Sequence, residues 1–326
     1  MNKGFDYQEN YVKFFLQRNQ VIQYDNFKEI EENTRNDVRI KNIINELKNW
    51  PCYEIKTHKN VDHPLHKLSF LAELGFNKQD TGIEEILKNI FKNQSEEGPF
   101  NVLINIPIRF GGSGQAKLTW VMSDAPVLIY AAIKLNQYKL NKEILTALDA
   151  IVNKVSENGW HCKASKELGK FRGPGRNSDP CPYATMFSLK MLGLTSKEKY
   201  RKEKKIGIDA IFGLWEKREI ERPYLFGMGT DFKKLKLPFV WYDILNMVDT
   251  LSLYPEIYHE KIFQEMFKII KDKETSEGYI PESIYLKAKK WDFGQKKKIS
   301  EYMNAVINRI ENRIENKVTV SASKTF

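Results

Sequence analysis

Two kinds of helical segment alternate along this chain, and their alternation constrains the fold more than any other sequence feature. One kind carries apolar residues at positions i, i+3 or i+4 and i+7 with charged residues between them, which is typical of amphipathic outer helices. These segments span 35–47, 82–94, 141–159, 204–218 and 259–273. The other kind carries fewer charges, as buried inner helices do. These segments span 63–76, 122–135, 181–194, 238–253 and 300–310.

The order of outer helix, loop and inner helix recurs about five times, as in helical repeat arrays. Similar turns follow the outer helices: "NWPCY" at 49, "SEEGPF" at 95, "SENGWHC" at 156 and "TSEGYIPES" at 275. In the fourth unit "EIERPYLFGMG", from 219, departs from this pattern. A glycine after the last helical turn is a natural C-cap. The aromatic residue that follows it has no such local explanation.

These units resemble the repeats of terpenoid cyclases and protein prenyltransferases, in which a Gly-aromatic turn ends an outer helix. A Thr- and Ala-bearing inner helix follows, in the manner of "NGW…PYATMFSLKML". The resemblance covers residues from about 35 to 312 and implies an all-α fold, an α/α toroid of about five helical hairpins around a central cavity. Residues 1–34 are then expected to form an N-terminal helical extension, and residues 313–326 a polar C-terminal tail.

Bulk properties agree with a folded globular protein. A chain of 326 residues with 41% hydrophobic content supports a sizeable core. The first twenty residues are too polar for a signal peptide, and no stretch approaches the ~20 apolar residues of a membrane helix. We therefore expect a cytoplasmic protein with no membrane span. The three cysteines are odd in number and far apart, which favours reduced thiols over a disulfide framework.

The formal charge of +10 is spread over nearly the whole chain. Dispersed lysines are typical of solvated helix faces, and no zinc-finger, RRM or basic-zipper pattern accompanies them. The densest basic runs, 197–205 and 233–236, lack the interleaved aromatic residues that stack on bases. No nucleic-acid partner is expected.

The segment "GRNSDPCPY" is similar to a segment of protein prenyltransferase β subunits in which an Asp and a Cys bind zinc. The resemblance implies that Asp179 and Cys181 are metal ligands. The family takes its third ligand from a later His, but 238–253 and 295–312 contain none; the nearest substitutes are Asp243 and His161. The alternative is that Asp179 caps the inner helix and Cys181 is a small buried hydrophobic residue.

The loop before this segment is basic and rich in small residues. A flexible loop of this kind can turn guanidinium and backbone N–H groups toward an anion, such as a diphosphate or a carboxylated sugar. The alternative is a solvated surface loop. Its cationic residues are Lys163, Lys166, Lys170, Arg172 and Arg176.

Three other long loops each contain a tryptophan near an acidic residue. The acidic residue lies either just before an inner helix or within the loop. Aspartates that begin successive inner helices would face one rim of a toroid. We therefore predict that Asp124, Asp179 and Asp243 are catalytic carboxylates. The predicted substrate-binding residues around the same mouth are Arg109, Trp120, Lys170, Arg172, Arg176, Tyr183, Trp241, Lys290 and Trp291. Core packing is the alternative role for the tryptophans.

These residues suit a small-molecule-binding toroid that acts on an isoprenoid or another anionic substrate, where aromatic faces stabilise a carbocation. The acidic DxDD and DDxxD motifs of terpenoid cyclases and synthases are absent from the sequence. A second hypothesis is a carbohydrate hydrolase or lyase that uses paired carboxylates as acid and base. A third is a non-catalytic helical-repeat protein whose concave face binds a partner.

Overall fold

The computed structural model describes residues 5–54, 60–169, 171, 178–220, 226–236 and 242–316. Within these ranges the chain is mostly helical, with one small sheet of two antiparallel strands, β1 (Val102–Asn105) and β2 (Ala116–Thr119). The helices are α1 (Asn10–Arg18), α2 (Phe27–Asn36), α3 (Val38–Leu47), α4 (Pro64–Leu74), α5 (Ile83–Lys92), α6 (Ala125–Leu135), α7 (Lys142–Val152), α8 (Pro182–Leu192), α9 (Arg201–Glu216), α10 (Ile244–Leu251), α11 (Lys261–Lys271) and α12 (Glu301–Asn316). The expectation of an all-helical fold class is confirmed at this level.

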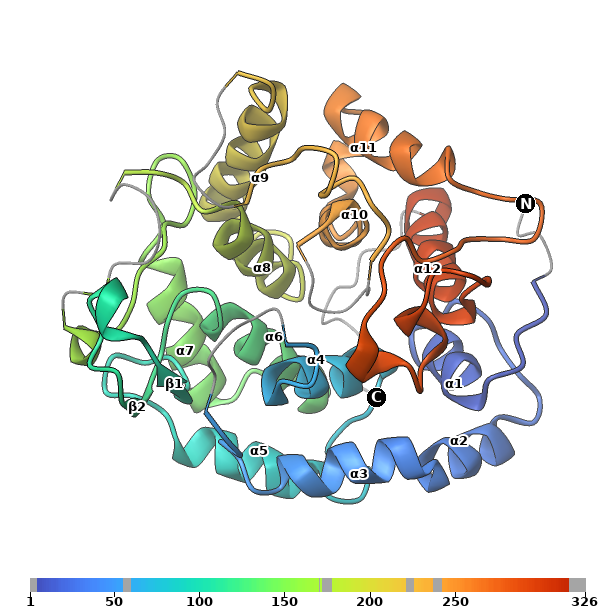
Figure 1. Ribbon diagram of the computed structural model, residues 1–326, viewed down its shortest axis with the longest axis horizontal. Coiled ribbons are helices and arrows are strands. Elements are labelled where there is room, and N and C mark those ends of the chain that lie inside the picture. Colours follow the sequence, from blue (N-terminus) through green and yellow to red (C-terminus); the bar gives the residue numbers. More distant parts are fainter. Residues whose placement is uncertain are drawn as a thin grey trace.

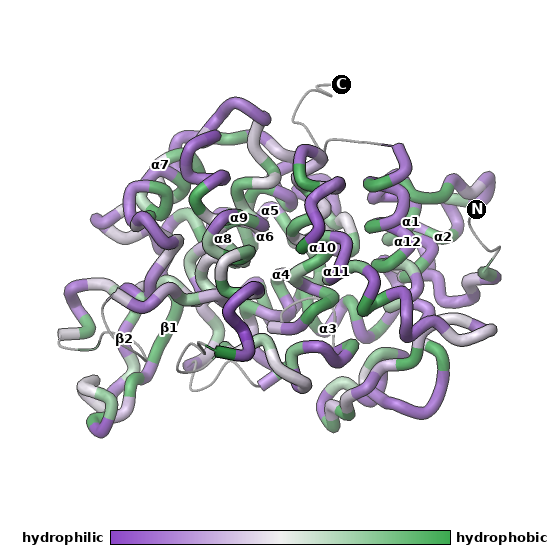
Figure 2. The backbone as a smooth tube through the Cα atoms, turned by 90° about the horizontal axis from the view of Figure 1, so that it is seen from above, coloured by the Kyte–Doolittle hydropathy of each residue, from purple (hydrophilic) through white to green (hydrophobic). Residues whose placement is uncertain are grey.

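Each of the ten predicted segments contains an α-helix, and burial separates the two kinds as the sequence pattern predicts. In α5 the buried residues are Ile83, Ile86, Leu87 and Ile90, one stripe at positions i, i+3, i+4 and i+7. In α6 and α8 every residue is buried. The hydropathy colouring in Figure 2 follows this division, with polar residues frequent on the outer helices.

The inner helices form a closed cycle of neighbours (Figure 1). Helix α4 contacts α6, α6 contacts α8, α8 contacts α10, and α10 contacts α12. Helix α1 contacts both α12 and α4 and so completes the cycle. The segment 1–34, expected as an extension, thus supplies a sixth inner helix. The carboxylate of Glu301 also accepts hydrogen bonds from the backbone N–H groups of Gln8 and Glu9.

The outer helices pack against this cycle from outside. Helix α7 contacts α6, α9 contacts α8, and α11 contacts α10. Helix α2 contacts α1, and α3 contacts α4. Because an outer helix returns the chain between two inner helices, consecutive inner helices run in the same direction. Their N-terminal ends therefore meet at one end of the molecule.

The repeated Gly-aromatic turns share one backbone geometry. In three of them the glycine N–H donates to the carbonyl three residues earlier: Gly98 to Ser95 (3.0 Å), Gly159 to Ser156 (3.2 Å) and Gly278 to Thr275 (3.3 Å). Their φ angles are 104°, 101° and 131°, a region that L side chains rarely adopt. The aromatic residues after them, Phe100, Trp160 and Tyr279, are buried.

The same turn anchors the start of the next inner helix in two units. The backbone N–H of Cys181, just before α8, donates to the Trp160 carbonyl (3.0 Å). In the same way, the N–H of Ser300, just before α12, donates to the Tyr279 carbonyl (3.0 Å). The aromatic residue of the turn therefore both fills the core and fixes where an inner helix begins, which explains its place in the repeat.

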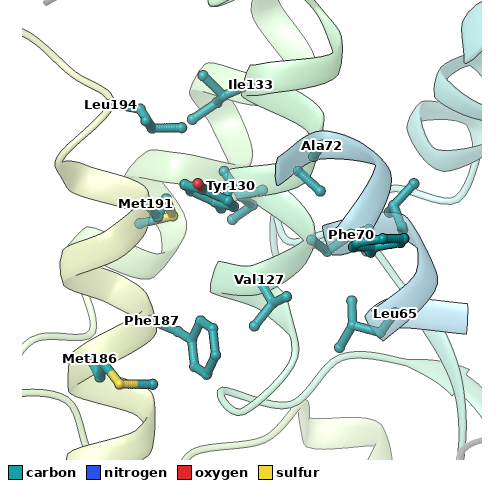
Figure 3. Close-up of a cluster of buried hydrophobic side chains, with 14 of the residues drawn as sticks. Leu65, Phe70, Ala72, Val127, Tyr130, Ile133, Met186, Phe187, Met191 and Leu194 are labelled. Carbon is teal, nitrogen blue, oxygen red and sulfur yellow. The ribbon is translucent and has the colours of Figure 1, made fainter. Parts of the chain in front are cut away.

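Apolar side chains fill the space between adjacent inner helices. Figure 3 shows Leu65, Phe70 and Ala72 of α4 facing Val127, Tyr130 and Ile133 of α6, with Met186, Phe187 and Met191 of α8 beyond them. None of the helices in the described part of the chain has the length and apolar character needed to cross a lipid bilayer.

Candidate functional site

Polar side chains stand at the N-terminal ends of the inner helices, inside the protein. Helices α6, α8 and α10 are preceded by Asp124, Cys181 and Asp243, and all three residues are buried. Because these helices run in the same direction, the three side chains lie at the same end of the cycle. We call this end the inner-helix entrance. With Tyr183, the second residue of α8, it contains four of the residues predicted from the sequence.

Tyr183 connects the starts of the three helices. Burial raises the pKa of its phenol well above the ordinary value, and the nearby charges of Asp124 and Cys181 raise it further. The centroid of its ring lies 6.4 Å from that of Tyr242, the residue before Asp243. The structure therefore brings Asp124, Cys181 and Tyr183 together, with Asp243 next to the same group.

Aromatic rings gather around Tyr183 at the inner-helix entrance. The ring centroid of Tyr183 lies 4.8 Å from that of Phe187 and 5.0 Å from that of Phe226. The rings of Phe226 and Phe232 both contact the ring of Tyr242. This aromatic cluster consists of Tyr183, Phe187, Phe226, Phe232 and Tyr242. It draws on α8 and on the segments that lead into α10, so its shape depends on how the loops enter the inner helices.

Asp243 is held by the backbone. Its carboxylate accepts hydrogen bonds from the N–H groups of Asn246 (2.8 Å) and Lys236 (3.0 Å), so it caps α10 and ties the preceding segment to it. Burial raises the pKa of Asp243 to about 7, although these N–H groups and the charge of Lys236 favour the ionised form.

Asp124 differs from Asp243 in its contacts. The hydroxyl of Ser123 donates to Asp124 Oδ1 (2.8 Å), and Asp124 does not cap α6 through its side chain. Its charge acts on Tyr183, so it lies near the aromatic cluster.

The proposed zinc ligands are only partly assembled. Cys181 is buried, and its Sγ accepts a hydrogen bond from the N–H of Ala184 (3.5 Å). Asp179 is half-buried two residues earlier. Of the two substitutes for a third ligand, His161 has its Nε2 2.5 Å from Asn158 Oδ1, and Asp243 binds backbone N–H groups. In the described ranges no group of three His, Cys, Asp or Glu side chains is placed to hold a metal ion, so these residues do not fit a catalytic zinc site.

The two described tryptophans of the predicted mouth are both buried in the hydrophobic core, where they have different neighbours. Trp120 is buried, with the Lys154 ammonium 5.0 Å from its ring centroid. Trp291 is buried against Tyr11 and Phe70, and the Arg39 guanidinium covers its face at 4.5 Å. Both contribute to core packing, and the structure does not bring them together.

Arg109 and Lys290 are exposed. Arg109 lies between β1 and β2, with its guanidinium 4.8 Å from the ring centroid of Phe110. In Figure 2 the β1–β2 hairpin projects from the body of the molecule. The carbonyl of Lys290 accepts a hydrogen bond from Arg39 (3.0 Å), while its side chain is in solvent. Lys170, Arg172, Arg176 and Trp241 lie outside the described residues.

A second group of charged residues escaped the sequence analysis. Each inner helix from α4 to α12 contributes at least one buried charge near its C-terminal end, opposite the entrance. This central charge cluster consists of Glu73, Lys134, Lys190, Asp249, Arg309 and Arg313. The signal in the sequence is a single charge near the end of an otherwise apolar segment, as in "SFLAEL" and "FSLKML".

Direct ion pairs join the charge cluster across the cycle. Lys190 Nζ lies 3.0 Å from both Glu73 Oε1 and Asp249 Oδ2. Arg309 bonds to the same two carboxylates, at 2.6 and 2.8 Å. Burial opposes the ionisation of Glu73, but the charges of Lys190, Lys134 and Arg309 hold its pKa well below the ordinary value. Helices α4, α8, α10 and α12 are therefore linked through their side chains.

Comparisons with protein-family models, with curated proteins and with solved structures found no match to this chain.

Proposed function

We propose that the chain is an α/α toroid that binds a small molecule with an apolar body and an anionic group at the inner-helix entrance. The isoprenoid diphosphates are the class that fits best. The observation that carries the proposal is the gathering of Asp124, Cys181 and the aromatic cluster around Tyr183, where three successive inner helices begin. The toroid itself rests on the closed cycle of inner helices with outer helices around it.

The two parts of the ligand have different partners in this proposal. The aromatic cluster offers π faces to an unsaturated hydrocarbon chain and to any positive charge that develops on it. The anionic group is assigned to the basic loop that carries Lys170, Arg172 and Arg176, which leads directly into α8. Asp124 and Asp243 are the acid–base groups in reach of that chemistry, Asp243 having a pKa of about 7.

Calorimetric titration with three probes tests the proposal. Farnesyl diphosphate combines both parts of the ligand, whereas farnesol and inorganic diphosphate each supply one. We expect farnesyl diphosphate to bind at least tenfold more tightly than either part. Phe226→Ala removes a half-buried ring that stacks on Tyr183, and we expect it to weaken binding about three- to tenfold, since an aromatic pair is worth about 0.5–1.5 kcal/mol.

The control is Asp209→Asn, because Asp209 is exposed on α9 and pairs only with Lys205 at 2.6 Å among the described contacts. It should leave the affinity unchanged. Equal binding of all three probes would contradict the proposal. If the protein instead binds and cleaves oligosaccharides, the carbohydrate-active alternative is supported. Asp124 and Asp243 would then be its paired acid and base carboxylates. A lack of response to every small ligand would favour the non-catalytic repeat protein.

A further inference from the structure

The exposed apolar side chains of this protein gather at one end of the molecule. Among the described residues eight large apolar side chains are exposed, and all but Val38 lie on segments that lead from an outer helix into an inner helix. Because these segments end where the inner helices begin, the side chains belong to the end that holds the inner-helix entrance. We call the surface that carries them the entrance face. The seven residues are Tyr53, Ile108, Phe110, Leu118, Ile220, Ile284 and Leu286.

The β1–β2 hairpin contributes three of these side chains. Ile108 is 75% exposed and Phe110 is 58% exposed, and they stand on either side of Arg109. Every residue from 107 to 118 except Gly112 is exposed, and the hairpin projects from the lower side of the molecule in Figure 2. The sequence has no acidic residue between Glu97 and Asp124. The hairpin therefore presents apolar and cationic groups together, without a negative charge of its own.

The segment 283–300, which leads into α12, combines the same two kinds of group. Its exposed apolar residues are Ile284 and Leu286, of which Leu286 is 72% exposed. Its one acidic residue is Asp292, whose carboxylate accepts hydrogen bonds from the hydroxyls of Tyr11 (2.6 Å) and Ser300 (2.9 Å). Asp292 is thus bonded to α1 and to the start of α12. The segment also has six lysines, all exposed: Lys287, Lys289, Lys290, Lys296, Lys297 and Lys298.

Formal charge is distributed unequally between the two ends of the molecule. The segments that lead into α4, α6, α8, α10 and α12 contain 24 Lys and Arg against 17 Asp and Glu. These segments are 48–63, 93–124, 153–181, 217–243 and 272–300. The segments that lead from inner to outer helices contain 4 Lys and Arg against 5 Asp and Glu. They are 19–26, 75–82, 136–141, 193–200 and 252–260. The end that carries the exposed apolar groups is therefore also the cationic end.

This combination matches the chemistry of an anionic lipid bilayer. Apolar side chains can enter the boundary of the acyl chains, while lysine and arginine are attracted to acidic headgroups. A nucleic acid would also attract the cations, but five of the seven apolar side chains are aliphatic and offer no ring on which a base could stack. We propose that the entrance face binds the surface of a bilayer that contains anionic lipids. This inference goes beyond the proposed function and does not depend on it.

Flotation of the purified protein with lipid vesicles tests the proposal. One set of vesicles is phosphatidylcholine alone, and the other contains about 30% phosphatidylserine in addition. We expect the protein to float with the anionic vesicles and to bind the neutral ones at least tenfold more weakly, since the headgroup charge then makes no contribution. Added salt should weaken binding to the anionic vesicles, because it screens the attraction between exposed charges.

Substitutions on the hairpin test the apolar contribution. Ile108→Ser combined with Phe110→Ser should weaken binding to anionic vesicles about tenfold or more, because less apolar surface leaves water. The matched control is Ile108→Leu combined with Phe110→Leu, which keeps both side chains apolar and should preserve binding. Both residues are exposed, so the thermal unfolding midpoint should stay that of the parent protein.

Substitutions of lysine test the contribution of charge. Lys289→Gln combined with Lys297→Gln should weaken binding about tenfold or more, since one basic residue near an anionic surface contributes roughly fivefold, or ~1 kcal/mol. The matched control is Lys139→Gln combined with Lys197→Gln. These lysines are exposed in turns at the opposite end of the molecule, and their loss should leave binding nearly unchanged.

Three results would overturn the proposal: no flotation with anionic vesicles, equal binding to neutral and anionic vesicles, or equal losses in the Lys289 and Lys139 double variants. A single-stranded RNA that binds the protein when anionic vesicles do not would also overturn it and assign the entrance face to nucleic acid. Titration with farnesyl diphosphate contains no lipid vesicles, so failure of isoprenoid binding would leave the flotation results unchanged.

Discussion

Gly159 occupies a position that only glycine fits, for two independent reasons. Its φ angle is 101°, outside the region that L side chains prefer. A Cβ at this position would lie 2.8 Å from Thr185 Oγ1 and 3.0 Å from the Cβ of Ala210. The turn therefore brings an outer-helix end into direct contact with α8, the helix at the centre of the candidate site.

The first prediction concerns this residue. Gly159→Ala should lower the free energy of unfolding by about 2–4 kcal/mol, since backbone strain and overpacking each cost about 1–3 kcal/mol. Gly213→Ala is the matched control, because Gly213 lies within α9 and a Cβ there would meet no atom within 4 Å. It should be neutral or stabilising by up to ~1 kcal/mol. Urea unfolding followed by circular dichroism measures both, and equal effects would contradict the argument.

The sequence alone predicted which residues lie at the inner-helix entrance, but it did not predict their contacts. The sequence placed Asp124, Cys181 and Asp243 at the starts of inner helices, because helix starts can be inferred from capping and periodicity. It could not show that the Asp243 carboxylate binds the N–H of Lys236, since that contact depends on a loop without periodicity. Neither could it show that Trp120 and Trp291 are both buried in the hydrophobic core with different neighbours.

Among the elements, the helices were predictable and the strands were not. The periodic apolar stripe of α5 or α11 is a strong signal over ten or more residues. Strands β1 and β2 have four residues each and pair only with one another in the described structure. Their sequences lie within a long loop between an outer and an inner helix, where no alternation separates a short strand from irregular chain.

Helix capping provides the second prediction. The side chain of Asn141 accepts a hydrogen bond from the N–H of Ile144 (3.0 Å) at the start of α7. Asn141→Ala should lower the free energy of unfolding by about 1 kcal/mol, since it leaves that donor without its cap. Asn26→Ala is the control, because Asn26 stands before α2 without a side-chain cap bond. Thermal unfolding compares the two, and a larger loss at Asn26 would contradict the prediction.

At the scale of the whole molecule, the sequence predicted the alternation of helices but not the charge cluster that joins them. Each of its charges is ordinary when its own segment is considered. Their meeting becomes apparent only when α4, α8, α10 and α12 are placed around one centre, and the pairs join residues as far apart in sequence as Glu73 and Arg309. Removing one partner from such a buried pair costs about 3–5 kcal/mol, because the other charge is left uncompensated.

The third prediction is a pH dependence of stability with two slopes. Burial opposes ionisation of Asp249, but Arg309, Lys190 and Arg313 hold its pKa at about 2. The unfolded chain therefore takes up the proton first as the pH falls, and this stabilisation is present above about pH 4 and is lost from about pH 4 toward pH 2. Asp243 acts in the opposite direction: its raised pKa of about 7 means that stability falls as the pH rises from about 4 to 7.

Urea midpoints measured between pH 2 and 8 separate the two groups. Asp249→Asn should reduce the slope on the acid side, and Asp243→Asn should reduce the slope between about pH 4 and 7. Over each of the two pH ranges, the free energy of unfolding is expected to change by an amount on the order of a few kcal/mol. Glu84→Gln is the control, since Glu84 is exposed and pairs with Lys88 at 3.1 Å. Identical curves for all three variants would contradict the assignment.

The closure of the cycle between its first and last helices has a consequence for synthesis. Tyr302 of α12 packs against Phe15 of α1, with ring centroids 5.2 Å apart, and Glu301 binds the backbone 293 residues before it. A ribosome makes α1 long before it makes α12. Until the last helix emerges, the apolar face of the first has no partner there, and Glu73 lacks Arg309. A chain that stops before α12 thus exposes Phe15, and chaperones and proteases recognise such exposed apolar surface.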